Sequence, residues 1–497
     1  MEIINHLLYG FSVSFEPINL LHCIVGVAVG TLVGVLPGLG PVGAISLLLP
    51  LTLKVSSPVS GLIMMAGVYY GAMYGGSTTS ILVNIPGEAA SVITCLDGYQ
   101  MALKGRAGPA LGIAAFSSFI AGTIAIIGLM LLAPPLASLA LLFGPPEYAT
   151  LMFLSLTILS YVTSGSMAKS FMMAALGLVI GTVGMDAVTG EYRFSYGVIA
   201  LEDGFGLVPV AMGYFGLGEV FWNVEYWLTM SVFKKKIKGL FPNLEDWKRT
   251  ALPILRGTVI GFFSGILPGA GTVTGAFISY VVEKKLSKYP EEFGKGEIKG
   301  VAAPESANNA ACQAAFIPML TLGIPSTAPM AIMLGALMIY GVDPGPFLIT
   351  KHPDLFWGVV TSMYTGNLLL LILNLPLIPM WVRFLKIPYV FLFPMIVLFC
   401  MIGAYSINNS MMDILIMSIF GVVGYLMKKV GYEGVPLVLA LVLGPLFENS
   451  TRLSLIMSRG SFLIFFTRPI AVAFLIIAFI LIISPYVLRI RWSRKKS

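Results

Sequence analysis

Residues 75–87 read Gly-Gly-Ser-Thr-Thr-Ser-Ile-Leu-Val-Asn-Ile-Pro-Gly, and they lie inside a hydrophobic stretch too long to be a surface loop. The segment carries hydroxyls, an amide and glycines, but no charge. Gly75 and Gly76 weaken a helix, because glycine loses the most backbone entropy on ordering, and Pro86 removes a backbone donor. We therefore expect a helix that breaks at membrane depth, with its free ends and these side chains forming a solute and ion site.

The composition is that of a membrane protein. The chain of 497 residues is 57% hydrophobic and only 11% charged, whereas a soluble domain is about 25% charged. Many stretches reach the roughly 20 apolar residues that a span needs. Backbone polar groups in lipid must be satisfied internally, so we expect the spans to be helices. The net charge of +7 comes from basic residues at span ends, which indicates topology and not nucleic-acid binding.

Two Pro-Gly motifs predict re-entrant hairpins. The first, at residues 36–41 (Leu-Pro-Gly-Leu-Gly-Pro), separates apolar residues 20–36 from 42–53. The second, Pro268-Gly269, separates arms at 257–267 and 272–282. Each of these arms would reach about 16 Å as a helix, roughly half of the hydrocarbon thickness. The alternative is one long kinked helix followed by a loop.

The two halves of the chain repeat these features in the same order, which predicts an internal duplication. The echoes are Gly34-Val-Leu-Pro-Gly38 with Gly265-Ile-Leu-Pro-Gly269, Asn84-Ile-Pro86 with Gly323-Ile-Pro325, and Val208-Pro209 with Val435-Pro436. Each half would contain one hairpin and about five crossings, one of them a discontinuous helix. Because five is odd, the halves would insert with opposite orientation.

The predicted fold is therefore an all-α polytopic membrane protein of two inverted repeats. Its parts are an N-terminal segment 1–19, a first repeat 20–232, a basic cytoplasmic linker 233–252, a second repeat 253–460, and a C-terminal helix with basic tail 461–497. The expected crossings are 61–103, 108–132, 147–165, 170–188 and 207–230, then 301–341, 357–380, 388–407, 411–427 and 434–458. Charge distribution places the C-terminus in the cytoplasm and loop 186–206 outside.

Neutral oxygens and small residues near the breaks define the candidate site. Half-helix N-termini suit a carboxylate, and glycines would let the backbone approach it. The predicted substrate-binding residues are Gly38, Gly40, Ser77, Thr78, Thr79, Asn84, Gly269, Gly271, Thr272, Asn308, Asn309, Ser326 and Thr327. Carbonyl and hydroxyl oxygens also suit sodium, by analogy with calcium and magnesium. The predicted sodium ligands are Ser80, Pro86, Gly87, Ser306, Thr321 and Gly323.

Other roles stay open for these residues. Gly, Ser and Thr also line helix contacts in membranes without any ligand. Glu88 and Glu305 are the deepest acids; an acid inside a span indicates function, but each adjoins a proline break and could cap a helix. Asp97 and Lys104 are expected at the membrane interface. The three histidines are too scattered for a metal site, and Gly-Leu-Gly-Pro-Val-Gly at 38–43 lacks the βαβ context of a dinucleotide site.

These stretches resemble the large membrane subunit of tripartite tricarboxylate transporters, the TctA family. The resemblance is carried by Gly34–Gly43, Tyr74–Gly108, Gly265–Ala276 and Pro304–Pro346, and it covers nearly the whole chain. It implies a bacterial inner-membrane secondary transporter that imports a carboxylate by cation symport, usually with sodium. Citrate and other tri-, di- and aromatic carboxylates all stay open as substrates. The resemblance also implies a small membrane subunit and a periplasmic solute-binding protein as partners, and an elevator-like architecture.

No cofactor is expected besides the coupling ion, and the sequence holds no ATP-binding motif or nucleophile elbow. Three other functions stay open: an ion-conducting channel, an intramembrane enzyme and a non-transporting scaffold. A channel would conduct without a binding protein, and a scaffold would tolerate loss of both Pro-Gly tips. An enzyme needs a nucleophile–base pair or paired acids at depth, which the sequence does not offer, so the chain is predicted not to be an enzyme.

Overall fold

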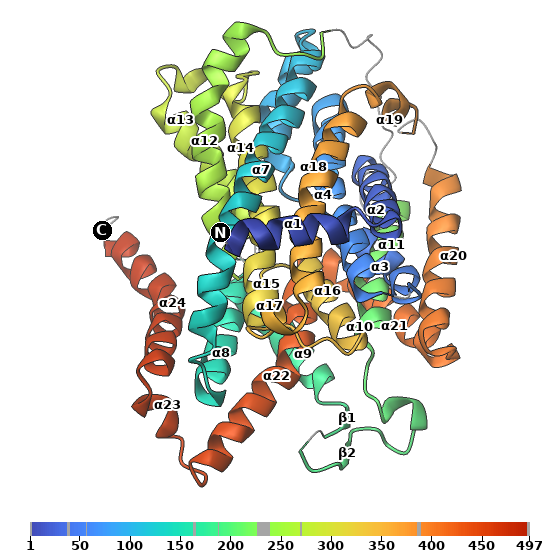
Figure 1. The fold of residues 1–497 in the computed structure, drawn as a ribbon, viewed down its shortest axis with the longest axis vertical. Helices are drawn as coiled ribbons and strands as arrows, with labels where there is room; N and C mark the ends of the chain where they lie inside the picture. The colour runs from blue at the N-terminus through green and yellow to red at the C-terminus, as the bar shows by residue number, and fades with distance from the viewer. Residues whose placement is uncertain are drawn as a thin grey trace.

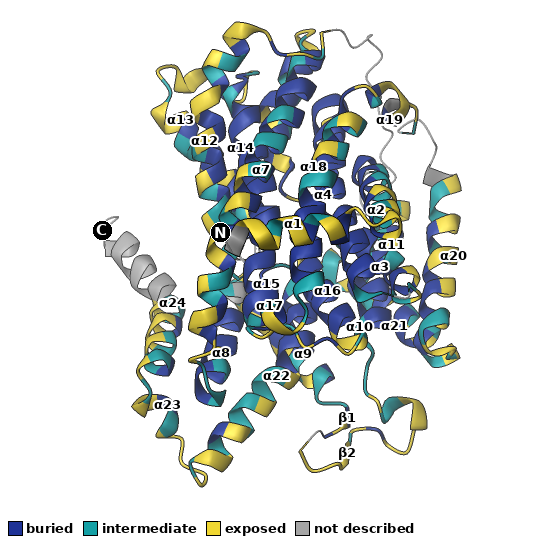
Figure 2. Ribbon diagram, viewed as in Figure 1, coloured by how far each residue is buried: buried dark blue, intermediate teal, exposed yellow. Residues whose placement is uncertain are grey.

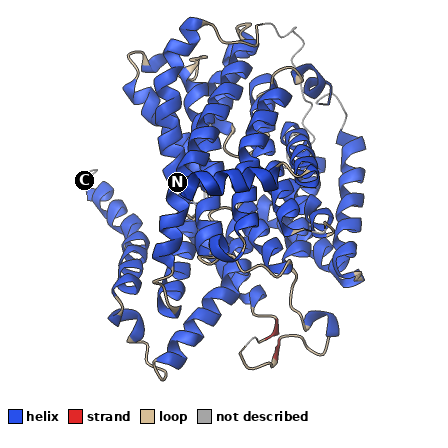
Figure 3. Ribbon diagram, in the orientation of Figure 1, coloured by secondary structure: helices blue, strands red, loops and turns tan. Residues whose placement is uncertain are grey.

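The computed structural model is built almost entirely of helices, with a single short two-stranded sheet in the part that it describes (Figure 3). The described residues are 2–36, 40–55, 57–162, 166–186, 188–225, 239–268, 271–384 and 389–494. Gly38 and Gly269, at the two predicted hairpin tips, lie outside the described residues. So do residues 226–238, which include the start of the predicted linker.

The described helices and strands follow in the order below, and the helix Glu2–Ser14 lies in a segment for which no helix was predicted. The first half contains α1 (Glu2–Ser14), α2 (Pro17–Val35), α3 (Gly40–Leu53), α4 (Pro58–Val83), α5 (Val92–Thr94), α6 (Gln100–Leu103), α7 (Ala107–Ala140), α8 (Pro145–Val162), α9 (Met167–Gly181), β1 (Gly184–Met185), β2 (Tyr192–Arg193), α10 (Leu207–Ala211) and α11 (Gly218–Glu225). The second half contains α12 (Leu244–Ile266), α13 (Gly271–Leu286), α14 (Lys299–Ala314), α15 (Phe316–Leu322), α16 (Ala328–Ile339), α17 (Leu348–Lys351), α18 (Pro353–Asn374), α19 (Ile378–Phe384), α20 (Tyr389–Asn408), α21 (Met411–Lys429), α22 (Val435–Met457), α23 (Ile464–Thr467) and α24 (Pro469–Arg494). Two π-helical turns, Cys95–Tyr99 and Met212–Leu217, join α5 to α6 and α10 to α11.

The described residues include six helices or helical runs long and apolar enough to cross a membrane: Pro17–Val35, Ala107–Ala140, Leu207–Glu225, Pro353–Asn374, Phe391–Asn408 and Met411–Lys429. The chain is thus an all-α, multi-pass membrane protein. Several predicted crossings have different bounds in the structure; residues 301–341, for example, form the three helices α14, α15 and α16. Helix α7 continues past residue 132 through Pro134 and Pro135 to Ala140, and α18 ends at Asn374 before a separate helix, α19.

Helices α4, α14 and α15 form the centre of the molecule (Figure 2). Every residue from Val59 to Val83 is buried, and so are those from Gly300 to Ala314 and from Phe316 to Thr321. A helix buried on all sides faces protein and not lipid. The hydroxyls and amides that these helices carry must therefore find their partners inside the protein.

Glycines on flanking helices let the central helices come close. A Cβ atom at Gly26, Gly30 or Gly34 of α2 would lie within 3.0 Å of backbone atoms of α4. A Cβ atom at Gly257, Gly261 or Gly265 of α12 would do the same to α14. The spacing of four residues puts each set of glycines on one face of its helix. The pairs α2–α4 and α12–α14 are thus built alike, although they lie in opposite halves of the chain.

The helices of the predicted hairpins are α2 with α3 and α12 with α13. The expectation of half-length first arms is wrong, because α2 spans 19 residues and α12 spans 23. Helix α12 begins early because Asn243 and Asp246 form a capping box, which satisfies two free N–H groups at its start. The second arms, α3 and α13, are shorter, with 14 and 16 residues.

The chain breaks after each central helix, beyond the polar stretches that were expected to open. Helix α4 runs without interruption to Val83 and ends at Asn84, whose backbone is left-handed (φ 60°). Helix α15 ends in the same way at Gly323 (φ 70°). The predicted crossing 61–103 is therefore discontinuous, with its break at residues 84–91.

The expectation that Gly75 and Gly76 open the helix is wrong. Both lie inside α4, and a Cβ atom at either would meet neighbouring groups: the backbone of α2 at Gly75 and the Glu88 side chain at Gly76. Their missing side chains serve close packing. Ser306, Asn308 and Asn309 likewise lie in the unbroken helix α14 and not at a helix end, which corrects the same expectation in the second half.

The outer helices enclose this centre. Their large exposed apolar side chains, on α12, α20 and α24 among others, cover the outside of the molecule (Figure 2). Helix α1 crosses the front of the bundle in Figure 1 and packs on α18, where the rings of His6 and Trp357 stack at 5.2 Å. At one end of the molecule, Arg452 of α22 bonds Asp186 of the β1–β2 loop at 2.8 Å and anchors that loop.

Candidate functional site

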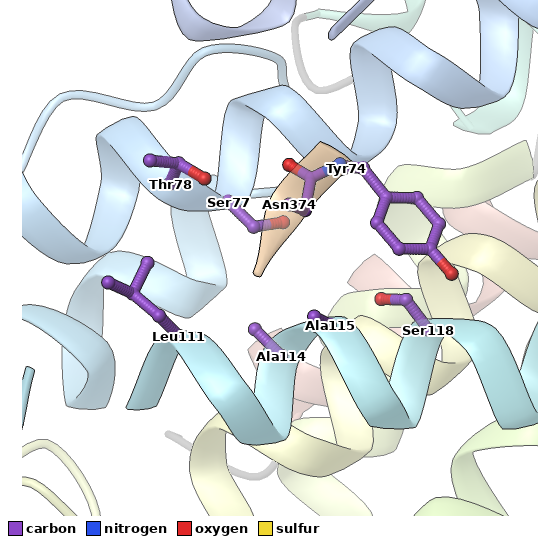
Figure 4. A pocket seen from close by; sticks show the side chains of 8 residues that line it. All are labelled: Tyr74, Ser77, Thr78, Leu111, Ala114, Ala115, Ser118 and Asn374. Atoms are coloured by element: carbon purple, nitrogen blue, oxygen red, sulfur yellow. The ribbon is translucent and has the colours of Figure 1, made fainter. Parts of the chain in front are cut away.

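A small pocket lies between α4, α7 and the end of α18 (Figure 4). The residues that line it are Tyr74, Ser77, Thr78, Leu111, Ala114, Ala115, Ser118 and Asn374. Four of these carry hydroxyls and one an amide, while none is charged. Apolar residues of α7 form one wall, so a ligand would meet polar groups on one side and hydrocarbon on the other, as in most small-molecule sites.

A buried carboxylate adjoins this pocket. Glu305 of α14 is only 1% exposed. It accepts hydrogen bonds from Ser77 Oγ at 2.7 Å, Thr94 Oγ1 at 2.5 Å and Ser118 Oγ at 3.4 Å. These donors belong to α4, α5 and α7, so four elements converge on one carboxyl group. Because Ser77 and Ser118 also line the pocket, the carboxylate is one hydroxyl group away from it.

A second acid, Glu88, lies in the break after α4. Its Oε1 accepts a hydrogen bond from Asn308 Nδ2 at 3.1 Å, and its Oε2 accepts one from the backbone N–H of Ala90 at 2.5 Å. The Ser91 hydroxyl donates to the Glu88 carbonyl and lies 2.9 Å from Ser80 Oγ. Glu88 thus caps the turn that follows the break and connects it to α14.

Amide groups of α14 are only partly paired. Asn309 Nδ2 donates to Ser118 Oγ at 2.7 Å and to the Glu305 carbonyl at 3.1 Å. Among the described residues, however, Asn309 Oδ1 has no hydrogen-bond partner, and neither has Asn308 Oδ1 or Gln313 Oε1. A buried unsatisfied polar group costs about 1–3 kcal/mol, so unpaired oxygens this deep in the protein point to a ligand or ion that would complete them.

The predicted substrate residues of the first half separate into two groups. Ser77 and Thr78 face the pocket. Thr79 faces α2, because its hydroxyl donates to the Val35 carbonyl at 2.8 Å and caps the end of that helix. Asn84 is exposed and supplies the left-handed residue that ends α4. Gly40 begins α3, also with a left-handed backbone (φ 58°).

The predicted substrate residues of the second half lie on three elements. Asn308 and Asn309 of α14 reach the first half through Glu88 and Ser118, as described above. Thr327 caps α16 by accepting from the Met330 N–H at 3.5 Å, and it packs against Gly271 at the start of α13. Thr272 is buried beside Gly271, and the Ser326 hydroxyl lies 3.5 Å from the Ala315 carbonyl.

The predicted sodium ligands have separate contacts. Ser306 and Thr321 each donate to a carbonyl one turn earlier in their own helix, Ala302 and Ile317 respectively. Ser80 lies in α4, and its hydroxyl donates to Ser91 Oγ at 2.9 Å. Pro86 and Gly87 belong to the first break, where Gly87 packs against Gly34 and Gly76. Gly323, at the second break, packs against the Pro344 carbonyl.

Sequence reasoning missed several residues of this network. Thr94, Ser118 and Asn374 are polar residues in apolar segments, and no local pattern distinguishes them from packing residues. Asp97 was expected at the membrane interface, and its role inside the protein was not predicted: its side chain is fully buried. It accepts hydrogen bonds from the backbone N–H groups at residues 294, 296 and 297 and from Tyr280 OH. The glycines at 294 and 296 were the one available signal for such a loop.

The chemistry of the site limits what it can hold. Within the described ranges, no group of three or more His, Cys, Asp or Glu side chains could hold a metal ion. The polar groups around the pocket are hydroxyls, amides and single carboxylates. Such a set suits a hydrogen-bonding solute and a hard cation that accepts neutral oxygens.

The fold and the site together define a multi-pass helical membrane protein with a neutral polar pocket at its centre. The model of the tripartite tricarboxylate transporter TctA family matches residues 20–439. The chain belongs to this family and is a membrane subunit of a tripartite tricarboxylate transporter. This family consists of transporters and not of enzymes, in agreement with the prediction that the chain is not an enzyme.

Two proteins of Agrobacterium vitis are similar to the chain. The "Uncharacterized 52.8 kDa protein in TAR-I ttuC' 3'region" is 49% identical over 496 residues, which are 100% of this chain and 99% of that protein. The "Uncharacterized protein in TAR-II ttuC' 3'region" is 52% identical over 234 residues, which are 47% of this chain and 97% of that protein. No solved structure matches the chain.

Proposed function

We propose that the chain is the permease subunit of a sodium-driven carboxylate importer in the inner membrane of a bacterium. A periplasmic solute-binding protein delivers the carboxylate, and a small membrane subunit completes the transporter. The observation that carries the proposal is the central pocket, in which the Ser77, Thr78 and Ser118 hydroxyls and the Asn374 amide surround a space with no charged lining residue. Hydroxyl and amide N–H groups donate hydrogen bonds to a carboxylate.

The lining of the pocket also favours symport over simple anion binding. An anion in a low-dielectric interior needs a counter-charge, and none of the lining residues supplies a positive one. A cation that travels with the carboxylate provides this charge. Sodium is a hard cation that prefers oxygen ligands, of the kind that surround the pocket.

Two inverted repeats, residues 20–232 and 253–460, would give this subunit an elevator-like architecture, in which the helical hairpins α2–α3 and α12–α13 each join a long first arm to a shorter second arm. The glycine-lined pairs α2–α4 and α12–α14 support the duplication, as do the left-handed ends of α4 and α15. Inverted repeats place broken helices at a shared site near mid-bilayer. The hydrogen bond between Ser77 of one half and Glu305 of the other supports such a meeting of the halves.

The proposed orientation places the β1–β2 loop in the periplasm and the basic C-terminal tail in the cytoplasm. The loop is held by Arg193, Arg452, Asp186 and Glu448, which form a network of ion pairs at one end of the molecule. Such a fixed, polar end is a suitable platform for a solute-binding protein. The substrate class is a carboxylate, with citrate, other tricarboxylates, dicarboxylates and aromatic carboxylates as its candidates.

The test is uptake of a panel of radiolabelled carboxylates into membrane vesicles that contain the complete transporter and receive the binding protein. Wild-type vesicles are expected to accumulate one class of carboxylate when sodium is higher outside. Ser77→Ala removes a hydroxyl that lines the pocket and bonds Glu305. Since a hydrogen bond to a charged group contributes about 1.5–3 kcal/mol, uptake should fall about 10- to 100-fold.

The matched control is Ser117→Ala on α7. The Ser117 hydroxyl is buried but donates to the carbonyl of Ala114 in its own helix, and Ser117 does not line the pocket. Its uptake should equal that of the wild type. Equal uptake by the Ser77 and Ser117 variants would count against the pocket, and ionic current without the binding protein or accumulation would instead favour a channel.

A further inference from the structure

The oxygen atoms around Glu305 form a set that the residues predicted as sodium ligands do not include. Two carboxylate oxygens of Glu305 meet the hydroxyls of Ser77, Thr94 and Ser118. All four side chains are at least nine-tenths buried, with exposures of 1–4%. They come from α14, α4, α5 and α7, so the site exists only when these elements are packed together.

An unpaired amide oxygen lies at the same place. Asn309 is 1% exposed, and its Nδ2 contacts Ser118 Oγ and the carbonyl of Glu305 itself. The Asn309 amide thus contacts the cluster through Nδ2, while its Oδ1 is buried and has no donor among the described residues. An oxygen that lacks a hydrogen donor beside a carboxylate is suited to a cation and not to a further proton donor.

The negative charge of Glu305 also favours a bound cation. The hydrogen bonds to its carboxyl group come from three neutral hydroxyls, and within the described part of the chain it forms no ion pair. A buried carboxylate without a counter-charge is strongly disfavoured. In a membrane-embedded protein it must therefore take up a proton or bind a small cation. A proton would leave the buried Asn309 Oδ1 without a partner, whereas a cation bound beside Ser118 offers this oxygen a positive charge as well.

We propose that the coupling sodium ion binds to the side chains of Glu305, Ser77, Thr94 and Ser118 and to the side-chain Oδ1 of Asn309. This inference rests on the proposed function and moves its sodium site away from the helix breaks to the junction of α4, α5, α7 and α14. Hydroxyl oxygens can turn their lone pairs toward the ion while the carboxylate supplies the negative charge. One carboxylate and neutral oxygens are the ligand types that hard cations prefer.

The position of this site explains how ion and solute binding would be linked. Ser77 and Ser118 belong both to the Glu305 cluster and to the pocket lining. A carboxylate in the pocket would therefore lie close to the Glu305 carboxylate and be repelled by it. A sodium ion at Glu305 removes this repulsion and adds an attraction, so the solute binds well only after the ion.

Glu88 does not meet the same conditions. One of its oxygens accepts from the Ala90 N–H and the other from the Asn308 amide. These donors stabilise the carboxylate as a cap of the turn. Among the described residues, neither donor to the Glu88 side chain belongs to the pocket lining. The charge of Glu88 is therefore explained by its role as a cap, whereas that of Glu305 is not.

The test measures binding of ²²Na⁺ to the purified full-length chain in detergent, with choline chloride keeping the ionic strength constant and no carboxylate present. Wild-type protein is expected to bind ²²Na⁺ that unlabelled NaCl displaces. Glu305→Gln should weaken this binding at least tenfold, and Ser118→Ala should weaken it severalfold. Ser117→Ala, the neighbouring control, should bind like the wild type. Glu305→Asp, which keeps the charge, is the alternative variant for the binding measurement if Glu305→Gln does not purify as a single folded species.

Two results would overturn the inference. Unchanged ²²Na⁺ binding by Glu305→Gln would show that the ion binds elsewhere. If the wild type still showed sodium-driven uptake, the proposed function would hold without this site. Absence of ²²Na⁺ binding by the wild type, together with proton uptake that Glu305→Gln abolishes, would assign Glu305 to a proton. Failure of the proposed function itself is a different result, because no sodium gradient would then drive accumulation of any carboxylate.

Discussion

The shared hydroxyls between Glu305 and the pocket lead to a quantitative prediction for sodium removal. Ser77 Oγ lies 2.7 Å from the Glu305 carboxylate. A solute carboxylate in the pocket that contacts the other side of this hydroxyl group lies roughly 3 Å beyond it, so the two negative groups are about 5 Å apart. With an effective dielectric constant near 20, their repulsion is about 3 kcal/mol. This corresponds to a loss of affinity on the order of 100-fold.

The assay is equilibrium binding of the carboxylate that wild-type vesicles accumulate, measured on purified transporter in NaCl and in choline chloride. Wild-type affinity should fall about 100-fold when choline replaces sodium. Glu305→Gln removes both the repulsion and the ion, so its affinity should be intermediate and nearly independent of sodium. Ser117→Ala should retain the wild-type dependence. Full sodium dependence in Glu305→Gln would refute the electrostatic reasoning.

Three further predictions concern the fold that holds the site. Gly261→Ala should lower the stability of the detergent-solubilised protein by about 1–3 kcal/mol, because the new Cβ would lie 2.5 Å from Ala307 Cα. The control is Gly181→Ala, whose new Cβ would have its nearest contact at 3.4 Å, and it should be neutral or stabilising. Asp97→Asn should expose loop 287–297 to protease, since three backbone N–H groups lose a charged acceptor. Hydrogen bonds, first from the Val188 N–H, lower the pKa of Asp186 to about 2, below the usual value of about 4. A lowered folded-state pKa stabilises the anchored β1–β2 loop above pH 4, and this stability should fade between pH 4 and 2. Cleavage of residues 184–206 by pepsin would detect the loss. Cleavage that does not change with pH in this range would contradict the prediction.

The glycines of this chain illustrate how one residue type serves two physical purposes. Glycine can open a helix because it adds backbone freedom, or it can bring two helices together because it has no side chain. The structure uses Gly75 and Gly76 for the second purpose, since added Cβ atoms would collide with α2 and with Glu88. At Gly323 the left-handed backbone ends the helix instead. The sequence around a glycine does not distinguish these uses, because the neighbour that decides lies on another helix.

The position of the acids gives a second example. Glu88 and Glu305 were both recognised as deep acids, with capping as the alternative to function. For Glu88 the side chain accepts from the backbone N–H of Ala90, which caps the turn before α5 and not a helix N-terminus. For Glu305, inside the unbroken helix α14, the partners are hydroxyls from three other elements. A single sequence shows that an acid is buried in an apolar segment, but the partners that give it a role are brought in by the tertiary fold.

The sequence by itself determined that this protein is helical and crosses a membrane, because composition and the length of apolar runs depend only on local residues. It also identified the family, and it predicted a chain break between residues 61 and 103, which the structure places at residues 84–91. Only the tertiary structure decided that Thr79 caps α2, that Asp97 holds a loop of the other half, and that Ser77, Thr94 and Ser118 meet at Glu305. The physical reason is that hydroxyls in apolar helices look alike in sequence, while their roles depend on which buried acceptor the packing of distant helices places within 3.5 Å.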